Sequence, residues 1–155
     1  MTCRSVVIYV KRRTLLTALG AGTAAGLSGC LSAVGGEGND GPCAGEDCDI
    51  GMSRMAFLPK EYEVSVGETV VWRNTSGAEH TVTAYEGAVP DEADFFDSGD
   101  HDSEEAAREG WAESRAGAIP VRGKYEHTFE VTGTYEYFCI PHERGGMVGT
   151  ITVTE

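Results

Sequence analysis

The stretch that decides the fold and the chemistry of this chain reads Tyr135-Glu-Tyr-Phe-Cys139-Ile-Pro-His142-Glu-Arg-Gly-Gly-Met147-Val-Gly-Thr-Ile-Thr-Val153. Two strand-like runs flank a loop that carries a thiol, an imidazole and a thioether at Cys-x2-His-x4-Met spacing. Each residue alone has an ordinary structural explanation, since a lone Cys is usually a small buried hydrophobe and a lone Met fills a core. Their combination in one loop, stiffened by Pro141, predicts a metal site instead.

The fourth donor has to come from elsewhere in the chain. A trigonal copper site takes two His, one Cys and a long, weak axial Met, and the loop holds three of these four side chains. The other histidines are His80, His101 and His127. We expect His80 to be the second imidazole, because it lies between two strand-like runs. His101 lies beside four acids and is expected on a solvated acidic surface, whereas His127 lies in an alternating strand and is expected to be structural.

The rest of the chain from about Ile50 predicts an all-β domain. Short runs with β-branched or aromatic residues recur between turn signals such as Gly67 and Gly133, a spacing typical of an antiparallel sandwich. The expected strands are Met52–Phe57, Tyr62–Val66, Glu68–Arg73, Thr81–Ala84, Lys124–Val131, Gly133–Phe138 and Val148–Thr154.

An excursion between two of these strands, residues 85–122, is not strand-like. Its capping residue, early acids and good helix formers predict a short helix from about Ser103 to Trp111. We expect Phe95, Phe96 and Trp111 to pin this excursion to the sandwich.

Residues 1–29 have the features of an export signal. Lys11, Arg12 and Arg13 precede a short apolar run that is too short to span a bilayer, and the paired arginines resemble a twin-arginine signal. Leu-Ser-Gly-Cys30 resembles a lipobox, in which Cys30 becomes the lipidated first residue of the mature protein. The alternative is an apolar N-terminal helix of the domain. Val6–Val10 is apolar upstream of the arginines, which favours a translation start near Val10.

Residues 30–49 are rich in Gly and acids and predict a flexible tether before the domain of residues 50–155. The tether contains Cys43 and Cys48. A small disulfide loop and two free thiols are both compatible with this pattern.

The charge of the chain restricts its partners. The formal net charge is −13. Residues 1–29 hold four of the 12 basic residues and no acid, so the remainder has 8 basic against all 25 acidic residues, a net charge of −17. Nucleic acid is an implausible partner for such a surface, because phosphate binding needs Lys and Arg. Excess acid favours a halophilic source, where salt screens the repulsion, over an ordinary acidic secreted protein.

The two ligand segments resemble the plastocyanin family, and more closely the halocyanins, the blue-copper proteins of haloarchaea. The resemblance covers about Met52–Glu155 and implies a Greek-key cupredoxin sandwich. Carried over by position, it implies one copper ion held by His80, Cys139 and His142, with Met147 as the weak axial ligand. Plastocyanins usually have Asn after the first His; here Thr81 stands in its place.

The resemblance also implies a function. Members of the family carry single electrons, and the edge of His142, in an apolar patch with Pro141, Gly145 and Gly146, is the expected electron port. Four protein ligands leave no open position for a substrate, so no enzyme is expected. The expected partners are redox proteins of a membrane electron-transport chain. We expect a monomer held on the extracytoplasmic face of the membrane through lipidated Cys30. The main alternative is an exported copper-delivery protein, although such proteins usually have exposed Met and His clusters.

Overall fold

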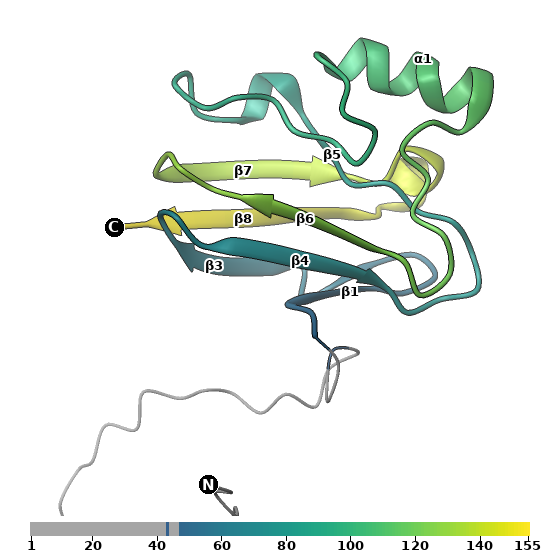
Figure 1. Ribbon diagram of the computed structural model, residues 1–155, viewed down its shortest axis with the longest axis horizontal. Coiled ribbons are helices and arrows are strands. Elements are labelled where there is room, and N and C mark those ends of the chain that lie inside the picture. The colour runs from purple at the N-terminus through teal and green to yellow at the C-terminus, as the bar shows by residue number, and fades with distance from the viewer. Residues whose placement is uncertain (1–42, 44–46) are drawn as a thin grey trace, which may run out of the picture. The chain divides into compact units, whose positions relative to one another are not determined.

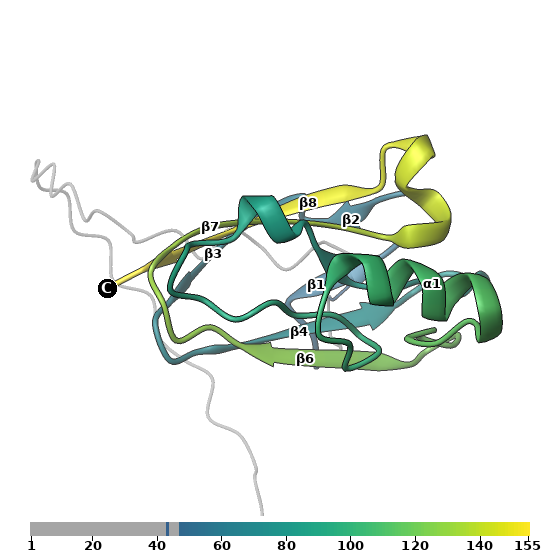
Figure 2. The same ribbon diagram turned by 90° about the horizontal axis from the view of Figure 1, so that it is seen from above.

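The computed structural model describes residue 43 and residues 47–155, and within them the chain forms two four-stranded β-sheets. Figures 1 and 2 show the sheets packed against each other, with the C-terminus at the end of the domain away from α1. The expected export signal and Cys30 lie outside the described residues, as does most of the expected tether. No described helix is both long and apolar enough to cross a membrane.

The strands fall into two sheets of different order. One sheet has the order β2-β1-β4-β6 and the other the order β3-β8-β7-β5. The elements in chain order are β1 (Ile50–Met52), β2 (Phe57–Leu58), β3 (Glu61–Ser65), β4 (Thr69–Asn74), β5 (Thr83–Ala84), η1 (Glu86–Ala88), α1 (Glu104–Ser114), β6 (Lys124–Thr128), β7 (Gly133–Phe138), η2 (Ile140–Gly145) and β8 (Val148–Thr154).

The all-β sandwich is confirmed, whereas the antiparallel arrangement expected from the strand spacing holds for four of the six strand pairs. β1 pairs with β4 in parallel, and β3 pairs with β8 in parallel. Only strands joined by a tight hairpin are forced to run antiparallel. The chain crosses between the sheets between β1 and β4, and β3 is far from β8 in sequence, so neither pair has that constraint.

The predicted strands differ from the observed ones mainly at their ends. The predicted strand Met52–Phe57 is two short strands, β1 and β2, because Ser53 and Ala56 close a turn between them, where the Ser53 amide donates to the Ala56 carbonyl over 2.9 Å. The predicted strand Thr81–Ala84 is reduced to β5. Its first two residues leave the ladder because Thr81 bonds to the loop after β7 instead.

The excursion contains the predicted helix, which ends three residues later than expected. Helix α1 begins after Ser103, whose hydroxyl accepts the Ala106 amide, and ends at Arg115, which is in the left-handed conformation. Phe96 is buried in the core and Phe95 packs against it, as predicted. Trp111 does not join that core and instead lies under the guanidinium of Arg115.

The core joins the two sheets through large aromatic side chains. Trp72 of β4 and Tyr137 of β7 are fully buried and meet edge to face, with ring centroids 5.5 Å apart. Such pairs add about 0.5–1.5 kcal/mol to the stabilisation from buried area alone. This contact fixes the first sheet, which leads to His80, against the second sheet, which leads to Cys139.

Cys43 and Cys48 form a disulfide just before the domain. Of the two alternatives that the sequence left open, the structure has the disulfide. The ordered contacts begin slightly before Ile50, because Asp49 exchanges hydrogen bonds with the backbone of Val71.

Candidate metal centre

The first imidazole is positioned by the loop that follows β4. Asn74, the last residue of β4, is fully buried, and its side-chain amide donates to the carbonyls of Ala78 at 2.6 Å and Ile119 at 3.0 Å. The loop is thereby folded back, and His80 pairs with Ile119 in a short bridge. The sequence Asn74-Thr-Ser76 fits the glycosylation pattern, but the amide nitrogen of Asn74 is buried and bonded to protein.

The other donors come from the turn between β7 and β8. Cys139 follows β7 directly, and η2 then carries Pro141 in its first turn and His142 after it. The turn ends at Gly146, with φ of 85°, a conformation that favours glycine. The amide of Cys139 donates to the carbonyl of Met147 over 3.1 Å, which closes the loop.

The structure brings three of the four predicted donor atoms together, those of His80, Cys139 and His142. The Cys139 sulfur lies 3.3 Å from Nδ1 of His142 and 3.6 Å from Nδ1 of His80. One donor atom from each of these residues lies within 4.8 Å of the others. Met147 is fully buried within the same loop.

The Cys139 thiol is buried and receives directed backbone donors. Burial raises its pKa to about 11, and N–H groups of Thr81 and His142 lower it in part. The Thr81 amide lies 3.4 Å from the sulfur. A metal cation can compensate this burial, because it binds the thiolate and supplies the missing positive charge.

The two histidines differ in exposure. His80 is fully buried, whereas His142 is partly exposed. Burial first, and then the nearby His142, lower the pKa of His80 to about 4. Burial also lowers the pKa of His142. Both rings are therefore neutral at pH 7 and have a lone pair to give to a metal.

Ser76 contacts the far side of the His80 ring. Its hydroxyl lies 2.7 Å from Nε2 of His80. The same oxygen accepts the Ala78 amide over 3.2 Å and lies 3.1 Å from the side-chain oxygen of Asn74, to which it can donate. If Nδ1 binds the metal, Nε2 carries the proton and donates it to Ser76, so every member of this network has a partner. The sequence reasoning missed Ser76, because a serine in a turn is an ordinary turn residue.

Thr81 joins the two ligand segments, in place of the Asn usual in plastocyanins. Its hydroxyl oxygen accepts the Ile140 amide over 2.8 Å, directly beside Cys139. The hydroxyl of Thr83 lies 3.5 Å from the same oxygen. Thr81 thus ties the His80 segment to the loop that carries Cys139 and His142.

The excursion is fixed to the ligand loop by Arg108 of α1. The guanidinium makes two hydrogen bonds to Glu143, of 2.7 and 3.0 Å, and its Nε binds Glu104 at 2.9 Å. It also lies over the ring of Phe138, 4.2 Å from the centroid. Tyr85 stacks on the same ring and donates to Glu143 over 2.9 Å. The residues next to both Cys139 and His142 are therefore held by the excursion.

The other two histidines lie away from this cluster. His101 does not lie on a solvated acidic surface as expected. Its Nδ1 binds Asp97 at 2.8 Å, and its ring packs against Gly99 and Gly110, which leave the space for it. His127 stacks on Phe96 with centroids 4.5 Å apart, which fits the expected structural role.

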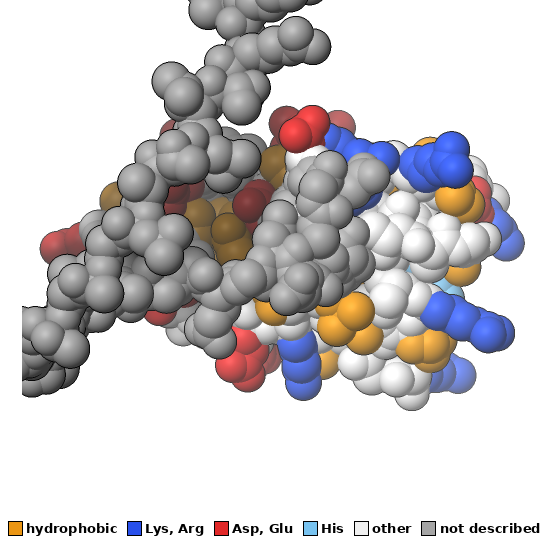
Figure 3. Space-filling model, turned by 90° about the horizontal axis from the view of Figure 1, so that it is seen from below, with side chains coloured by type: hydrophobic (Ala, Val, Ile, Leu, Met, Phe, Trp, Pro, Cys, Tyr) orange, Lys and Arg blue, Asp and Glu red, His pale blue; other side chains and the backbone are white. Residues whose placement is uncertain are grey.

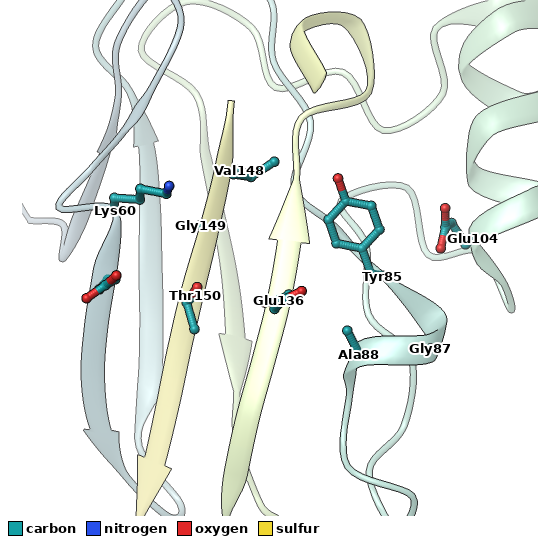
Figure 4. A pocket seen from close by; sticks show the side chains of 10 residues that line it. Lys60, Tyr85, Gly87, Ala88, Glu104, Glu136, Val148, Gly149 and Thr150 are labelled. Atoms are coloured by element: carbon teal, nitrogen blue, oxygen red, sulfur yellow. The ribbon is translucent and has the colours of Figure 1, made fainter. Parts of the chain in front are cut away.

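One groove of the domain is separate from the metal centre. It has a volume of about 600 Å³ and contains none of the four predicted donors (Figure 4). Its charged lining consists of Lys60 and three carboxylates, those of Glu61, Glu104 and Glu136.

The donor set fits copper. Soft thiolate and thioether groups together with imidazole suit copper, whereas carboxylates and carbonyls suit magnesium or calcium. No carboxylate belongs to the candidate metal cluster found among the described residues, which consists of His80, Cys139 and His142.

Comparison with known proteins agrees with this fit. Residues 45–154 match the family described as copper binding proteins of the plastocyanin/azurin family. A plastocyanin of Vicia faba is 33% identical over 99 residues, which cover 64% of this chain and 88% of that protein. A plastocyanin of Scenedesmus fuscus is 34% identical over 99 residues, which cover 64% of this chain and 87% of that protein. A solved purple cupredoxin from Nitrosopumilus maritimus is 22% identical with a TM-score of 0.47, and the match covers 70% of this chain and 100% of that chain. The chain belongs to the plastocyanin/azurin family of copper binding proteins.

Proposed function

We propose that the protein is a one-electron carrier in which His80, Cys139 and His142 hold copper and Met147 is the weak axial ligand. The observation that carries this proposal is a buried thiol with two neutral imidazoles, of which only His142 is partly exposed. Copper bound to such donors supplies a one-electron Cu(I)/Cu(II) couple.

Neighbouring residues keep the donor side chains in place when the copper is reduced and oxidised. Thr81 ties the His80 segment to Ile140, and Ser76 orients the His80 ring. Arg108 holds Glu143 beside His142. A site held in this way changes little between oxidation states, so little reorganisation energy opposes electron transfer. The partly exposed ring of His142 is the route to the surface.

The carrier assignment is tested by the colour of the copper-loaded protein. Cu(II) should give one intense visible absorption from thiolate-to-copper charge transfer, and ascorbate should bleach it reversibly. Cys139→Ser should abolish the absorption even if copper still binds through the imidazoles. Met147→Leu should keep the absorption and raise the reduction potential, because loss of the thioether favours Cu(I).

A colourless stoichiometric copper complex, or full colour in Cys139→Ser, would contradict the assignment and favour copper delivery. The burial of both sulfur donors speaks for the carrier, since a delivery protein needs ligands within reach of its acceptor. Cys139 and Met147 are both fully buried.

We further propose that the protein is a haloarchaeal carrier of the halocyanin type, anchored on the extracytoplasmic face of the membrane. The net charge of −13 and the Leu-Ser-Gly-Cys30 pattern support this proposal. Its redox partners are then components of a membrane electron-transport chain. Cys30→Ala should release the protein from the membrane fraction in cells, whereas Cys3→Ala should not, because only Cys30 lies in the lipobox-like pattern. Membrane fractionation that is unchanged in Cys30→Ala would rule out the lipid anchor.

A further inference from the structure

Four loops meet at one end of the domain, around the metal centre. They are residues 53–56, 75–82, 115–123 and 139–147. The ends of β1 and β4 are paired, β6 begins opposite that end of β4, and β7 ends opposite the start of β8. Direct contacts join the loops as well: His80 bridges Ile119, and the methyl group of Met55 packs against Gly145.

This end carries most of the basic residues of the domain. The exposed ones are Arg54, Arg115, Arg122 and Arg144 in three of the loops, and Lys124 at the start of β6. Arg115 pairs with Glu79, whereas none of the other four is in an ion pair with another described residue. We call these four residues the basic rim.

The acidic residues of the four loops are already in ion pairs with arginines. The loops contain only Glu79 and Glu143. Glu79 pairs with Arg115, and Glu143 pairs with Arg108. The loop end is therefore positive in a chain with a net charge of −13. Figure 3 shows Lys and Arg side chains gathered at one end of the visible face, next to a histidine and with apolar side chains between them.

The surface inside the basic rim is apolar and includes two residues without side chains. Met55 is 43% exposed, and Pro141, Gly145 and Gly146 are also exposed. The two glycines have no side chain to hold a partner away from the backbone, and His142 lies in the same loop. A partner that docks here therefore lies close to the donor atoms of the metal centre.

We propose that the basic rim is the docking surface for a redox protein whose own docking face is acidic. This proposal rests on the proposed function, because it concerns the route by which the electron leaves. Acidic groups around the partner's redox centre pair with the basic rim, and the acidic remainder of the domain repels the same partner. Both effects select the orientation in which His142 faces the partner. In molar salt, charges more than about 3 Å apart are largely screened from each other. The basic rim then acts through direct contacts with the partner rather than at long range.

An anionic membrane is the other surface that a basic rim could meet. The positions of the basic residues favour a protein, because they lie around the apolar surface with His142. A bilayer bound there would cover the route to the donor atoms.

The test is electron exchange between the full, copper-loaded chain in its reduced form and two small oxidants of opposite charge. One electron passes from the protein to hexacyanoferrate(III), which becomes hexacyanoferrate(II), or to tris(phenanthroline)cobalt(III), which becomes the cobalt(II) complex. The Debye length is about 30 Å at 0.01 M salt and about 10 Å at 0.1 M. As salt increases across this range, we expect the rate with the anionic oxidant to fall. The negative net charge alone would make that rate rise. A rate that rises with salt would overturn the proposal.

Variants identify the residues responsible. The triple variant Arg54→Gln/Arg122→Gln/Lys124→Gln leaves the ligand loop intact, so its visible spectrum should match that of the wild type. At low salt it should slow the anionic oxidant on the order of tenfold and speed the cationic one. Lys60→Gln is the matched control, because Lys60 lies in the acidic groove of Figure 4, and it should change either rate less than about twofold. Equal effects of the triple variant and the control would overturn the proposal.

The remaining outcomes separate the proposals. Electron exchange with neither oxidant would overturn the carrier function together with the docking surface, whereas exchange with the wrong salt dependence would overturn the docking surface alone. Vesicles of phosphatidylglycerol and phosphatidylcholine give the lipid comparison: wild type and triple variant should sediment with them equally. Vesicle binding that is lost in the triple variant would assign the basic rim to lipid and overturn the proposal.

Discussion

The hydroxyl of Ser76 lies 2.7 Å from Nε2 of His80, on the side of the ring that faces away from Cys139. When Nδ1 of His80 binds the metal, Nε2 carries the proton and the Ser76 hydroxyl accepts it. Because His80 is fully buried, no solvent replaces this partner.

Ser76→Ala should therefore weaken copper binding. The variant leaves Nε2–H of His80 without an acceptor, and loss of such a partner typically lowers metal affinity about 10- to 100-fold. The affinity is measured by competition with a chelator. Ser76→Thr keeps a hydroxyl and should restore most of the affinity. Ser98→Ala is the control, since Ser98 makes comparable hydrogen bonds to Val82 and Gly117 without touching a donor. Equal affinities in Ser76→Ala and Ser98→Ala would contradict the role of Ser76.

Arg108→Ala should loosen the ligand loop. It removes both hydrogen bonds to Glu143 and the contact with the Phe138 ring, and we expect a loss of about 1–2 kcal/mol in the free energy of unfolding. The backbone amides of residues 142–146 should exchange faster with solvent. Arg108→Lys keeps the charge but not the planar fork, so it should recover only part of the loss.

Arg115→Ala is the matched control for that experiment. Arg115 follows the same helix and also pairs with a glutamate, Glu79, but its side chain is 69% exposed. Such exposed pairs contribute about 0.2–1 kcal/mol and should leave the exchange of the ligand loop unchanged. Similar exchange in both variants would show that the excursion does not hold the loop.

The sequence predicted the fold class and the excursion helix because their signals are local. The alternation in Tyr62–Val66 comes from neighbours two residues apart, and the start of α1 from Ser103 and the acids after it. Parallel pairing of β3 with β8 was not predictable, because nothing near either strand specifies a partner so distant in sequence. The same holds for the ion pair of Arg108 with Glu143, which depends on how the excursion folds back.

The four predicted donors could be chosen from residue type and spacing, since few side chains bind copper. The groups that orient them are common residues whose role appears only in three dimensions. Ser76 and Thr81 are examples, because a hydroxyl in a loop is typical of any turn. His101 shows the converse error: its acidic neighbours in sequence suggested a solvated surface, whereas Asp97 and two glycines enclose its ring.

Binding of copper to the apoprotein at pH 7 should release one proton. Burial raises the pKa of the Cys139 thiol to about 11, so the thiol is protonated at pH 7 and must lose its proton to bind as thiolate. His80, with its pKa lowered to about 4, is already neutral and releases none. The apparent affinity should therefore rise about tenfold per pH unit from pH 7 towards pH 11. A pH-indicator dye in weak buffer measures the release, and Cys139→Ser should release no proton. Release of two protons by the wild type would show that a histidine is charged at pH 7.

The stability of the domain should increase with salt. The chain without residues 1–29 has a net charge of −17, and this repulsion reaches about 10 Å at 0.1 M salt but only about 3 Å at 1 M. We expect the melting temperature to fall from molar to dilute KCl, by about 4–8 °C for each 1 kcal/mol of added repulsion. Salt also strengthens the hydrophobic effect, so variants of opposite sign are needed to isolate the charge. Glu63→Gln and Glu126→Gln remove exposed acids and should reduce the dependence on salt, whereas Lys60→Gln removes an exposed base and should increase it. A melting temperature that is constant across this range, or equal slopes in the two kinds of variant, would rule out charge repulsion as the cause and remove the main support for a halophilic source.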